Sequence, residues 1–343
     1  MSEDDFLINT ANLGPYLRER GLVPSREDPT IRELGGGVSN IVLLAEWVGT
    51  AQRWVIKQSL EKLRVKDDWR SARERIFREA EAIKSLRPLL GKSALPEVIH
   101  VDEGNFLFVM TAAPAGSVVW KDLLLGRRAD LAVARQAALL LGRMINGSRA
   151  DPSFEKRFWD CTVFDQLRID PYYRMTAQRH PEVREHIEGL LAAMLQAQAA
   201  LVHGDYSPKN MLVRGDDIFL IDFEVIHWGD PAFDSAFLLN HLLLKAFHQP
   251  HAAPLYIAAA REFWRTLMAA LGAPSAWDFE RMTVHHLGAL MLARIDGKSP
   301  VEYIRDEETK DRVRRVAKRI LRERPQELEE VMGIVMRETH GPS

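Results

Sequence analysis

The chain has 343 residues, of which 46% are hydrophobic and 27% are charged. This length and composition are typical of a folded protein with a sizeable core and about two domains or lobes, and they exclude disordered and fibrous classes. With 46 basic and 48 acidic residues the net charge is −2, so no strong overall field attracts nucleic acid or an anionic membrane.

The cysteine content and the N-terminus indicate a compartment. Cys161 is the single cysteine, which rules out an intrachain disulfide and favours a reducing environment. The first five residues include three acidic ones and lack the apolar stretch of a signal peptide. No apolar run approaches the roughly 18 residues that a membrane span needs. We therefore expect a cytoplasmic protein that has neither nucleic acid nor membrane as a partner; the sequence leaves its oligomeric state open.

The first third of the chain has the pattern of a small sheet with one helix. Short apolar runs separated by glycine-containing turns predict strands, and apolar residues at i, i+4 and i+7 predict a helix. The expected strands are residues 31–34, 41–47, 54–56, 98–101 and 106–110, and the expected helix is 68–86, ended by Pro88 and Gly91.

A segment of small residues, 111–117, marks the expected lobe boundary, and helical patterns dominate beyond it. We predict an α+β protein with a small β-rich N-lobe, residues 1–112, and a larger, mostly helical C-lobe, residues 113–343. The expected C-lobe helices are 131–145, 182–201, 234–248, 255–271, 279–295 and 307–323, with short strands at 211–213 and 218–221.

Three polar residues stand between apolar strands in the segment from His203 to Glu224. Asn210 follows Asp205 by five residues, and Asp222 follows Asn210 by twelve. The two strand ends of one hairpin can bring Asn210 and Asp222 together, and Mg²⁺ prefers such oxygen ligands beside substrate phosphates. Asp205 would then orient a hydroxyl nucleophile and accept its proton.

The sequence HGDYSPKN followed by IDFE resembles the phosphotransferase signature of aminoglycoside and choline kinases, which are relatives of the protein kinases. The resemblance implies a protein-kinase-like fold of two lobes with ATP between them, and transfer of its γ-phosphoryl group to a small-molecule hydroxyl. It also implies Asp205 as the catalytic base and Asn210 with Asp222 as the Mg²⁺ ligands. His203 is expected to be structural.

The upstream lobe contains the remaining parts of this signature in the right order. Gly35, Gly36, Gly37 and Ser39 stand where the family has a phosphate-covering loop, and glycines let backbone N–H groups approach phosphate closely. Lys57 ends the third strand in a V-I-K pattern, the place of the lysine that binds the α- and β-phosphates.

A helix glutamate is expected to pair with that lysine. Glu79 is the preferred partner, and Glu81 stays an alternative because the two point about 200° apart around a helix. The strand that ends near Met110 would be the hinge, with the backbone of Thr111 to Ala113 receiving the adenine.

Departures from the protein-kinase pattern narrow the substrate class. The arginine that precedes the catalytic aspartate in many protein kinases is Gly204 here, and only a short segment links Asp222 to Gly229. A segment this short offers little surface on which a peptide substrate could bind. We therefore expect a small acceptor that is aminoglycoside-, choline- or sugar-like. Methylthioribose kinases fit this sequence less well. The acceptor itself and the preference for ATP or GTP stay open.

Three further residues or segments have competing interpretations. Lys209 is assigned a catalytic role, neutralising charge on the transferred phosphoryl group. Glu224 is either a third metal-side acid or a buried salt-bridge partner. The basic stretch 310–324 is interpreted as a solvated amphipathic helix rather than a nucleic-acid site. The alternative to a kinase is a catalytically silent nucleotide-binding regulatory module of the same fold.

Overall fold

A computed structural model gives the fold, and it describes residues 6–24, 29–35, 39–50, 52–62, 64, 71–272 and 276–340. Contacts divide the chain into two compact units. The first contains Met1–Ala115 together with Asp222–Glu224, and the second contains Gly116–Ile221 and Val225–Ser343. Three residues of the IDFE motif therefore cluster with the first unit, although the chain on both sides of them belongs to the second.

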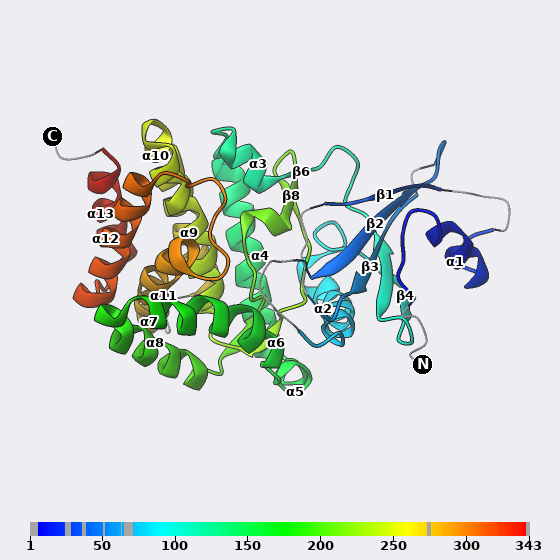
Figure 1. The fold of residues 1–343 in the computed structure, drawn as a ribbon, viewed down its shortest axis with the longest axis horizontal. Helices are drawn as coiled ribbons and strands as arrows, with labels where there is room; N and C mark the ends of the chain where they lie inside the picture. The colour runs from blue at the N-terminus through cyan, green and yellow to red at the C-terminus, as the bar shows by residue number, and fades with distance from the viewer. Residues whose placement is uncertain are drawn as a thin grey trace. The chain divides into compact units, whose positions relative to one another are not determined.

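The first unit is built on a five-stranded sheet in which every neighbouring pair is antiparallel (Figure 1). The strand order is β1-β2-β3-β5-β4. All five predicted strands are present, within three residues of the expected limits. They are β1 (Thr30–Glu33), β2 (Asn40–Glu46), β3 (Arg53–Ser59), β4 (Val98–Asp102) and β5 (Leu107–Thr111).

The two faces of this sheet have different partners because successive side chains of a strand point to opposite faces. On one face, Ile56 of β3 lies in an apolar cluster with residues of helix α1 (Leu13–Glu19), which the sequence analysis did not predict. Lys57, the next residue, points to the opposite face, where helix α2 (Arg75–Leu90) packs. The strand period thus directs the lysine toward α2.

Helix α2 starts later than the predicted helix, at Arg75 instead of residue 68; residues 71–74 precede it, and residues 65–70 lie outside the described part. Pro88 does not end it but lies in its last turn. The helix ends before Gly91, whose φ of 97° suits glycine and strains other residues.

The second unit contains two small sheets on either side of the segment from His203 to Asn210. Strand β7 (Ala200–Val202) pairs antiparallel with β10 (His227–Gly229), and the other sheet has the order β6-β8-β9. Its strands are β6 (Val118–Val119), β8 (Met211–Arg214) and β9 (Asp217–Leu220). The predicted helix 182–201 was too long, because its last apolar residues form β7, and a short apolar run does not distinguish a strand from a buried helix.

Helices form the rest of this unit (Figure 1). Helix α9 (Ala232–His248) is buried along nearly its whole length and packs against α10 and α11, as expected of a helix that is apolar all round. The other helices of the unit are α3 (Trp120–Leu125), α4 (Leu131–Ala150), α5 (Ser153–Phe158), α6 (Thr162–Phe164), η1 (Asp165–Arg174), α7 (Met175–Arg179), η2 (Pro181–Val183), α8 (Arg184–Gln196), η3 (Pro208–Asn210), η4 (Pro250–Ala252), α10 (Ala253–Leu271), α11 (Ala276–Asp296), α12 (Glu307–Glu323) and α13 (Leu328–His340).

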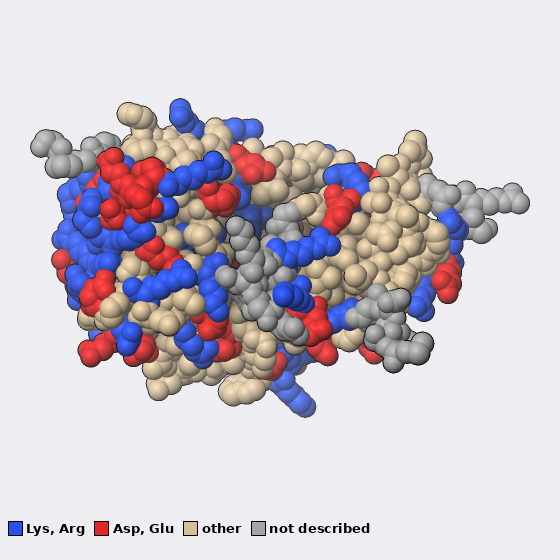
Figure 2. Space-filling model, viewed as in Figure 1, with Lys and Arg blue, Asp and Glu red and all other residues tan. Residues whose placement is uncertain are grey.

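The basic helix α12 is amphipathic. Its apolar residues, including Val313 and Ile320, are buried, and its cations form ion pairs with carboxylates. Arg315, for example, pairs with Glu338 of α13 at 2.9 Å. Basic and acidic side chains accordingly lie beside each other over the C-terminal helices (Figure 2). None of the described helices combines the length and apolarity required to cross a membrane.

Candidate functional site

The loop 203–210 connects β7 to β8 and is anchored from several sides. Its backbone N–H groups at His203 and Gly204 donate to the carboxylate of Asp234, the first acidic residue of α9, at 2.6 and 2.9 Å. The hydroxyl of Tyr206 donates to the carbonyl oxygen of Ala137 in α4 at 2.6 Å. Burial raises the pKa of Asp234 to about 7 although these N–H donors lower it. The loop is thereby fixed to the two helices.

Gly204 meets a steric requirement of this loop. Its φ is 76°, a left-handed conformation, and a Cβ atom there would lie 2.8 Å from the carbonyl oxygen of Val225. The position therefore needs glycine, which explains in structural terms why the residue before Asp205 is not the arginine of many protein kinases.

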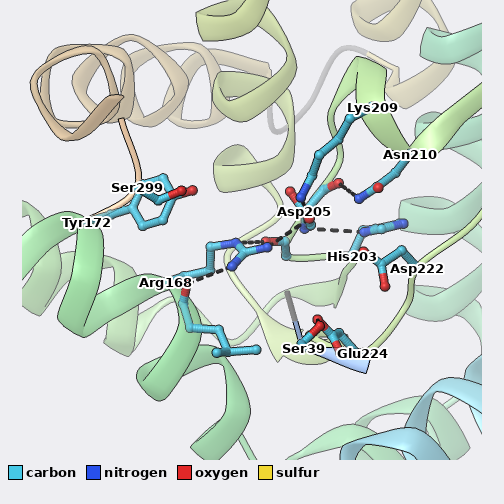
Figure 3. A network of polar contacts seen from close by, with 12 residues as sticks. Ser39, Arg168, Tyr172, His203, Asp205, Lys209, Asn210, Asp222, Glu224 and Ser299 are labelled. Carbon is cyan, nitrogen blue, oxygen red and sulfur yellow. Dashed lines mark hydrogen bonds and ion pairs between the residues drawn. The ribbon is translucent and has the colours of Figure 1, made fainter. Parts of the chain in front are cut away.

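Two cations converge on the buried carboxylate of Asp205 (Figure 3). Nη2 of Arg168 lies 2.9 Å from Oδ2 of Asp205, and Nζ of Lys209 lies 2.8 Å from the same oxygen. Arg168 is buried, whereas the side chain of Lys209 is 51% exposed. The ammonium of Lys209 thus neutralises Asp205 in this structure, and its exposed stem leaves it able to change partner.

Arg168 was not among the residues singled out from the sequence. It lies in η1, a ten-residue π-helix, a rare form that often occurs at functional sites. Its Nε donates to the carbonyl oxygen of Gly204 at 2.7 Å. No motif surrounds Arg168, and charged residues such as Asp165, Asp170 and Arg174 lie in the same stretch, so the sequence did not distinguish it from a surface arginine.

Asn210 ends the loop, and its amide has a defined orientation. Its Nδ2 donates to the carbonyl oxygen of Asp205 at 3.0 Å. Its Oδ1 accepts no hydrogen bond from any residue in the described ranges. The side chain therefore presents a carbonyl oxygen that remains able to accept a ligand.

In the first unit, Lys57 binds two carboxylates. Its Nζ lies 2.7 Å from Glu79 and 2.5 Å from Asp222. Glu79, fully buried on α2, is thus the partner of Lys57, and Glu81 on another face of the helix accepts from Ser85. The structure brings together Lys57, Glu79 and Asp222 from three separate parts of the chain.

The electrostatics of this group are those of a buried ion cluster. Burial lowers the pKa of Lys57, but the carboxylates of Asp222 and Glu79 outweigh it and hold the ammonium form. Burial raises the pKa of Glu79, against the effect of Lys57. Asp222 has a φ of 70°, and such strained conformations cluster at functional sites.

Glu224 is a buried salt-bridge partner, which decides between the two interpretations of this residue. Its carboxylate accepts from Ser39 Oγ at 2.8 Å and from Asn40 Nδ2 at 2.8 Å, and it pairs with Arg75 at 3.2 Å. The hydroxyl of Ser39, expected at the phosphates, is thus bound to Glu224 in this structure.

The other nucleotide-site candidates belong to the five-stranded sheet or follow its first strand. Gly35 is exposed after β1, and Gly36 and Gly37 lie outside the described residues. Met110 is buried in β5.

Hinge candidates after Met110 differ in their hydrogen bonds. The N–H of Thr111 donates to the carbonyl oxygen of Glu97 at 2.9 Å, so it is already used. The N–H of Ala113 makes no backbone hydrogen bond within the described residues. Of these two donors, Ala113 is therefore the one that remains available to a ligand.

The sequence from residue 30 to residue 282 matches the Phosphotransferase enzyme family, also called APH. Because the match covers most of the chain, this protein belongs to that family, and the resemblance seen in its motifs is confirmed.

Two curated relatives are similar in sequence. The chain is 28% identical to methylthioribose kinase 2 and 27% identical to methylthioribose kinase 1 of Oryza sativa subsp. japonica, in each case over 275 residues and 71% of this chain. The matches span 64% and 63% of those two proteins, less than two thirds of their length. The expectation that methylthioribose kinases fit less well than the other branches finds no support in these relatives.

A solved structure shows the fold. The amicoumacin kinase hAmiN, in complex with AMP-PNP, Ca²⁺ and Ami, superposes with a TM-score of 0.55 at 14% identity, covering 92% of this chain and 95% of that one. The chain has the predicted protein-kinase-like fold, with a β-sheet N-terminal region and a helical C-terminal region.

Proposed function

We propose that this protein is an ATP-dependent kinase that transfers the γ-phosphoryl group to a hydroxyl of a small molecule. The observation that carries the proposal is the buried carboxylate of Asp205, fixed in a loop that Asp234 and Tyr206 anchor, in a member of the phosphotransferase family. The curated relatives are kinases of a small sugar-like molecule, which supports an acceptor of that size.

Asp205 serves as the base in this proposal. A carboxylate that is held rigidly orients the acceptor hydroxyl and accepts its proton as the phosphoryl group is transferred. Arg168 fixes the orientation of that carboxylate by binding both its Oδ2 atom and the preceding carbonyl oxygen. During transfer, the ammonium of Lys209 leaves Asp205 and binds the phosphoryl group. There it stabilises the negative charge that develops on that group.

Asn210 and Asp222 have the donor chemistry of a Mg²⁺ site. One is an amide oxygen without a partner in the described ranges, and the other is a carboxylate, and hard cations take such oxygen ligands. When bound, the cation neutralises phosphate charge. These two residues would hold the cation, and Nζ of Lys57 lies 2.5 Å from the carboxylate of Asp222.

The first unit supplies the nucleotide contacts. Lys57, oriented by Glu79, binds the α- and β-phosphates, and Gly35, Gly36 and Gly37 belong to the loop that covers them. Ser39 supports that loop through its hydrogen bond to Glu224. Met110 lines the adenine pocket, and the N–H of Ala113 donates to the adenine ring. The 2.7 Å ion pair between Lys57 and Glu79 supports this assignment of Lys57 to the phosphates.

Mg²⁺-dependent phosphotransfer from ATP tests the proposal. ADP release is measured across methylthioribose, aminoglycosides, choline, ethanolamine and neutral or acidic sugars, with the wild type and Asp205→Ala. The expected result is an acceptor-dependent rate that falls about 10³-fold in Asp205→Ala, because a general base contributes that order of rate. Asp217→Ala, an exposed aspartate in β9, is the matched control and should keep the wild-type rate.

Two outcomes would contradict the proposal. Turnover that persists in Asp205→Ala would remove Asp205 from the chemistry. Calorimetric binding of ATP without turnover of any acceptor would favour the alternative, a silent nucleotide-binding regulatory module.

A further inference from the structure

Cationic side chains gather near Asp205 within the second unit. Arg168 and Lys209 contact Asp205 directly, as described above. Arg294, near the end of α11, and Lys245, near the end of α9, belong to the same neighbourhood. Tyr172 of η1 connects them, because its ring has the guanidinium groups of both Arg168 and Arg294 at 5.7 Å from its centroid.

Arg294 presents one edge of its guanidinium group without a protein partner. Its Nη1 donates to the hydroxyl of Tyr172 and to Oγ of Ser299, both at 3.0 Å, and to the carbonyl oxygen of Ser299. Its Nε is buried, and neither Nε nor Nη2 has a partner in the described ranges. Two parallel N–H donors on one guanidinium edge are the geometry that binds a carboxylate or phosphate in bidentate fashion.

Lys245 is a second cation without a counter-ion. Its side chain is fully buried, and its Nζ donates to the carbonyl oxygen of His241 at 3.2 Å and lies 5.1 Å from the centroid of the Tyr303 ring. No carboxylate of the described residues pairs with it. Burial, together with the neighbouring Lys121 and Arg294, lowers the pKa of Lys245 to about 7, although Glu302 acts to raise it.

The carboxylates of this neighbourhood are already paired. Asp205 binds Arg168 and Lys209, and Glu302 binds Lys121. Asp234, which accepts from the N–H groups of the 203–210 loop, is a third carboxylate near Asp205 and Arg168. Five cations thus face three carboxylates, and the surplus is largest beside Arg294 and Lys245. Buried like charges without an anion are unfavourable, and an anionic ligand would relieve that cost.

We infer that the acceptor of this kinase carries an acid group, a carboxylate or a phosphate, which the unpartnered edge of Arg294 binds while the acceptor hydroxyl lies at Asp205. The inference rests on the proposed function and names its substrate class: a hydroxylated acid rather than a cationic aminoglycoside or choline. Figure 3 shows Arg168 between Asp205 on one side and Tyr172 and Ser299, two residues that Arg294 contacts, on the other. An aminoglycoside ammonium would meet like charge at Arg294 and Lys245.

Binding of inorganic phosphate tests the anion site independently of turnover. Calorimetry is carried out on the full chain with saturating Mg²⁺ and a non-hydrolysable ATP analogue, so that the nucleotide site is occupied. The wild type should bind phosphate, Arg294→Gln should bind it at least tenfold more weakly, and Arg294→Lys should fall between them. Arg319→Gln, an exposed arginine of α12 that pairs with Glu323, is the matched control. Equal phosphate binding by the wild type and Arg294→Gln would overturn the inference.

Matched acceptor pairs test the substrate class. Glycerate is compared with glycerol, gluconate with sorbitol, and glucose 6-phosphate with glucose. The acid of a productive pair should have a kcat/KM at least tenfold higher than its uncharged analogue, and Arg294→Gln should abolish this preference by raising KM. Efficient turnover of uncharged or cationic acceptors, unaffected by Arg294→Gln, would overturn the inference and leave the proposed kinase intact. A loss confined to kcat would also overturn it.

A measurement of ATP binding distinguishes failure of the anion-site inference from failure of the proposed kinase function. Arg294→Gln should bind ATP like the wild type, since nucleotide contacts are assigned to the first unit. Failure of the wild type itself to bind ATP would contradict the proposed function and not the anion site, which the phosphate titration without nucleotide then decides.

Discussion

The two units treat buried charge differently. In the first, cations and carboxylates are matched: Lys57 lies between Glu79 and Asp222, and Arg75 pairs with Glu224. In the second, cations outnumber carboxylates around Asp205, and Arg294 has an edge without a partner in the described ranges. A matched cluster is complete by itself, whereas a surplus of one sign is stabilised by a ligand of the other.

Under the proposed function, this difference corresponds to a different part of the reaction for each unit. The matched cluster holds Lys57 and Asp222 in fixed positions. Such a rigid arrangement suits the binding of a nucleotide, which is the same in every catalytic cycle. The unmatched cations suit recognition of an acceptor. Substitutions should therefore cost folding stability in the first unit and kinetic specificity in the second.

Removing Lys57 should have the largest effect on stability. Lys57→Met leaves Glu79 and Asp222 as neighbouring carboxylates without a cation, one of them fully buried, so the free energy of unfolding should fall by about 3–5 kcal/mol. Urea unfolding followed by circular dichroism measures it. The double variant Lys57→Met/Glu79→Gln should recover part of the loss. A single variant within about 0.5 kcal/mol of the wild type would show that the cluster is not a unit.

Removing Arg168 should affect turnover more than binding. In Arg168→Gln, Asp205 loses the cation that orients it, and kcat should fall about 10- to 100-fold while the KM for ATP stays unchanged. Arg168→Lys should restore part of the rate. Arg174→Gln, an exposed arginine of the same π-helix that pairs with Asp165, is the control. Identical kcat values for the two glutamine variants would remove Arg168 from the positioning of the base.

Replacing Lys245 should change how stability depends on pH. The pKa of this buried lysine is lowered from 10.5 to about 7, so between these values the unfolded chain binds a proton that the folded chain does not. The contribution of Lys245 to stability therefore rises with pH from about 7 to 10.5. At pH 6 the free energy of unfolding of Lys245→Met should exceed that of the wild type by about 2 kcal/mol, and the difference should shrink toward pH 10. Urea unfolding at each pH measures it. A pH-independent difference would contradict the unpaired buried ammonium.

The smallest effect is expected at the hinge. Ala113→Pro removes an N–H that has no backbone partner in the described ranges, so the fold should be kept while ATP affinity falls about fivefold, the value of one hydrogen bond. Ala112→Pro is the contrast, since it breaks the 2.9 Å bond to Arg53 and should lower stability. Unchanged ATP affinity in Ala113→Pro would show that the adenine ring does not bind to the N–H of Ala113.

Local patterns were sufficient for the fold and for much of the site. The helical period at α2 showed that only one of Glu79 and Glu81 could face Lys57, and the family resemblance favoured Glu79, which the structure places 2.7 Å from the lysine. The family was recognisable from the segment 203–224 because its chemistry requires fixed residue types at fixed distances. Helix limits were less accurate, as at residue 68, because Pro and Gly signals do not locate the first turn.

The features that sequence did not predict depend on tertiary contacts. Arg168 belongs to the site only because a π-helix directs it at Asp205, and nothing near it in the sequence marks that contact. Ser39 was expected at phosphate, but Glu224, distant in sequence, takes its hydroxyl. The unpaired state of Lys245 is likewise a property of the packed structure.

The central claim is that the first unit binds ATP and that Asp205 of the second unit acts in the transfer. The most direct test titrates the wild type, Lys57→Met and Asp205→Asn with ATP and Mg²⁺ and measures their phosphotransfer rates. The account predicts that Lys57→Met loses ATP affinity at least tenfold, whereas Asp205→Asn binds ATP like the wild type and turns over about 10³-fold more slowly. Wild-type affinity in Lys57→Met, or wild-type turnover in Asp205→Asn, would contradict it.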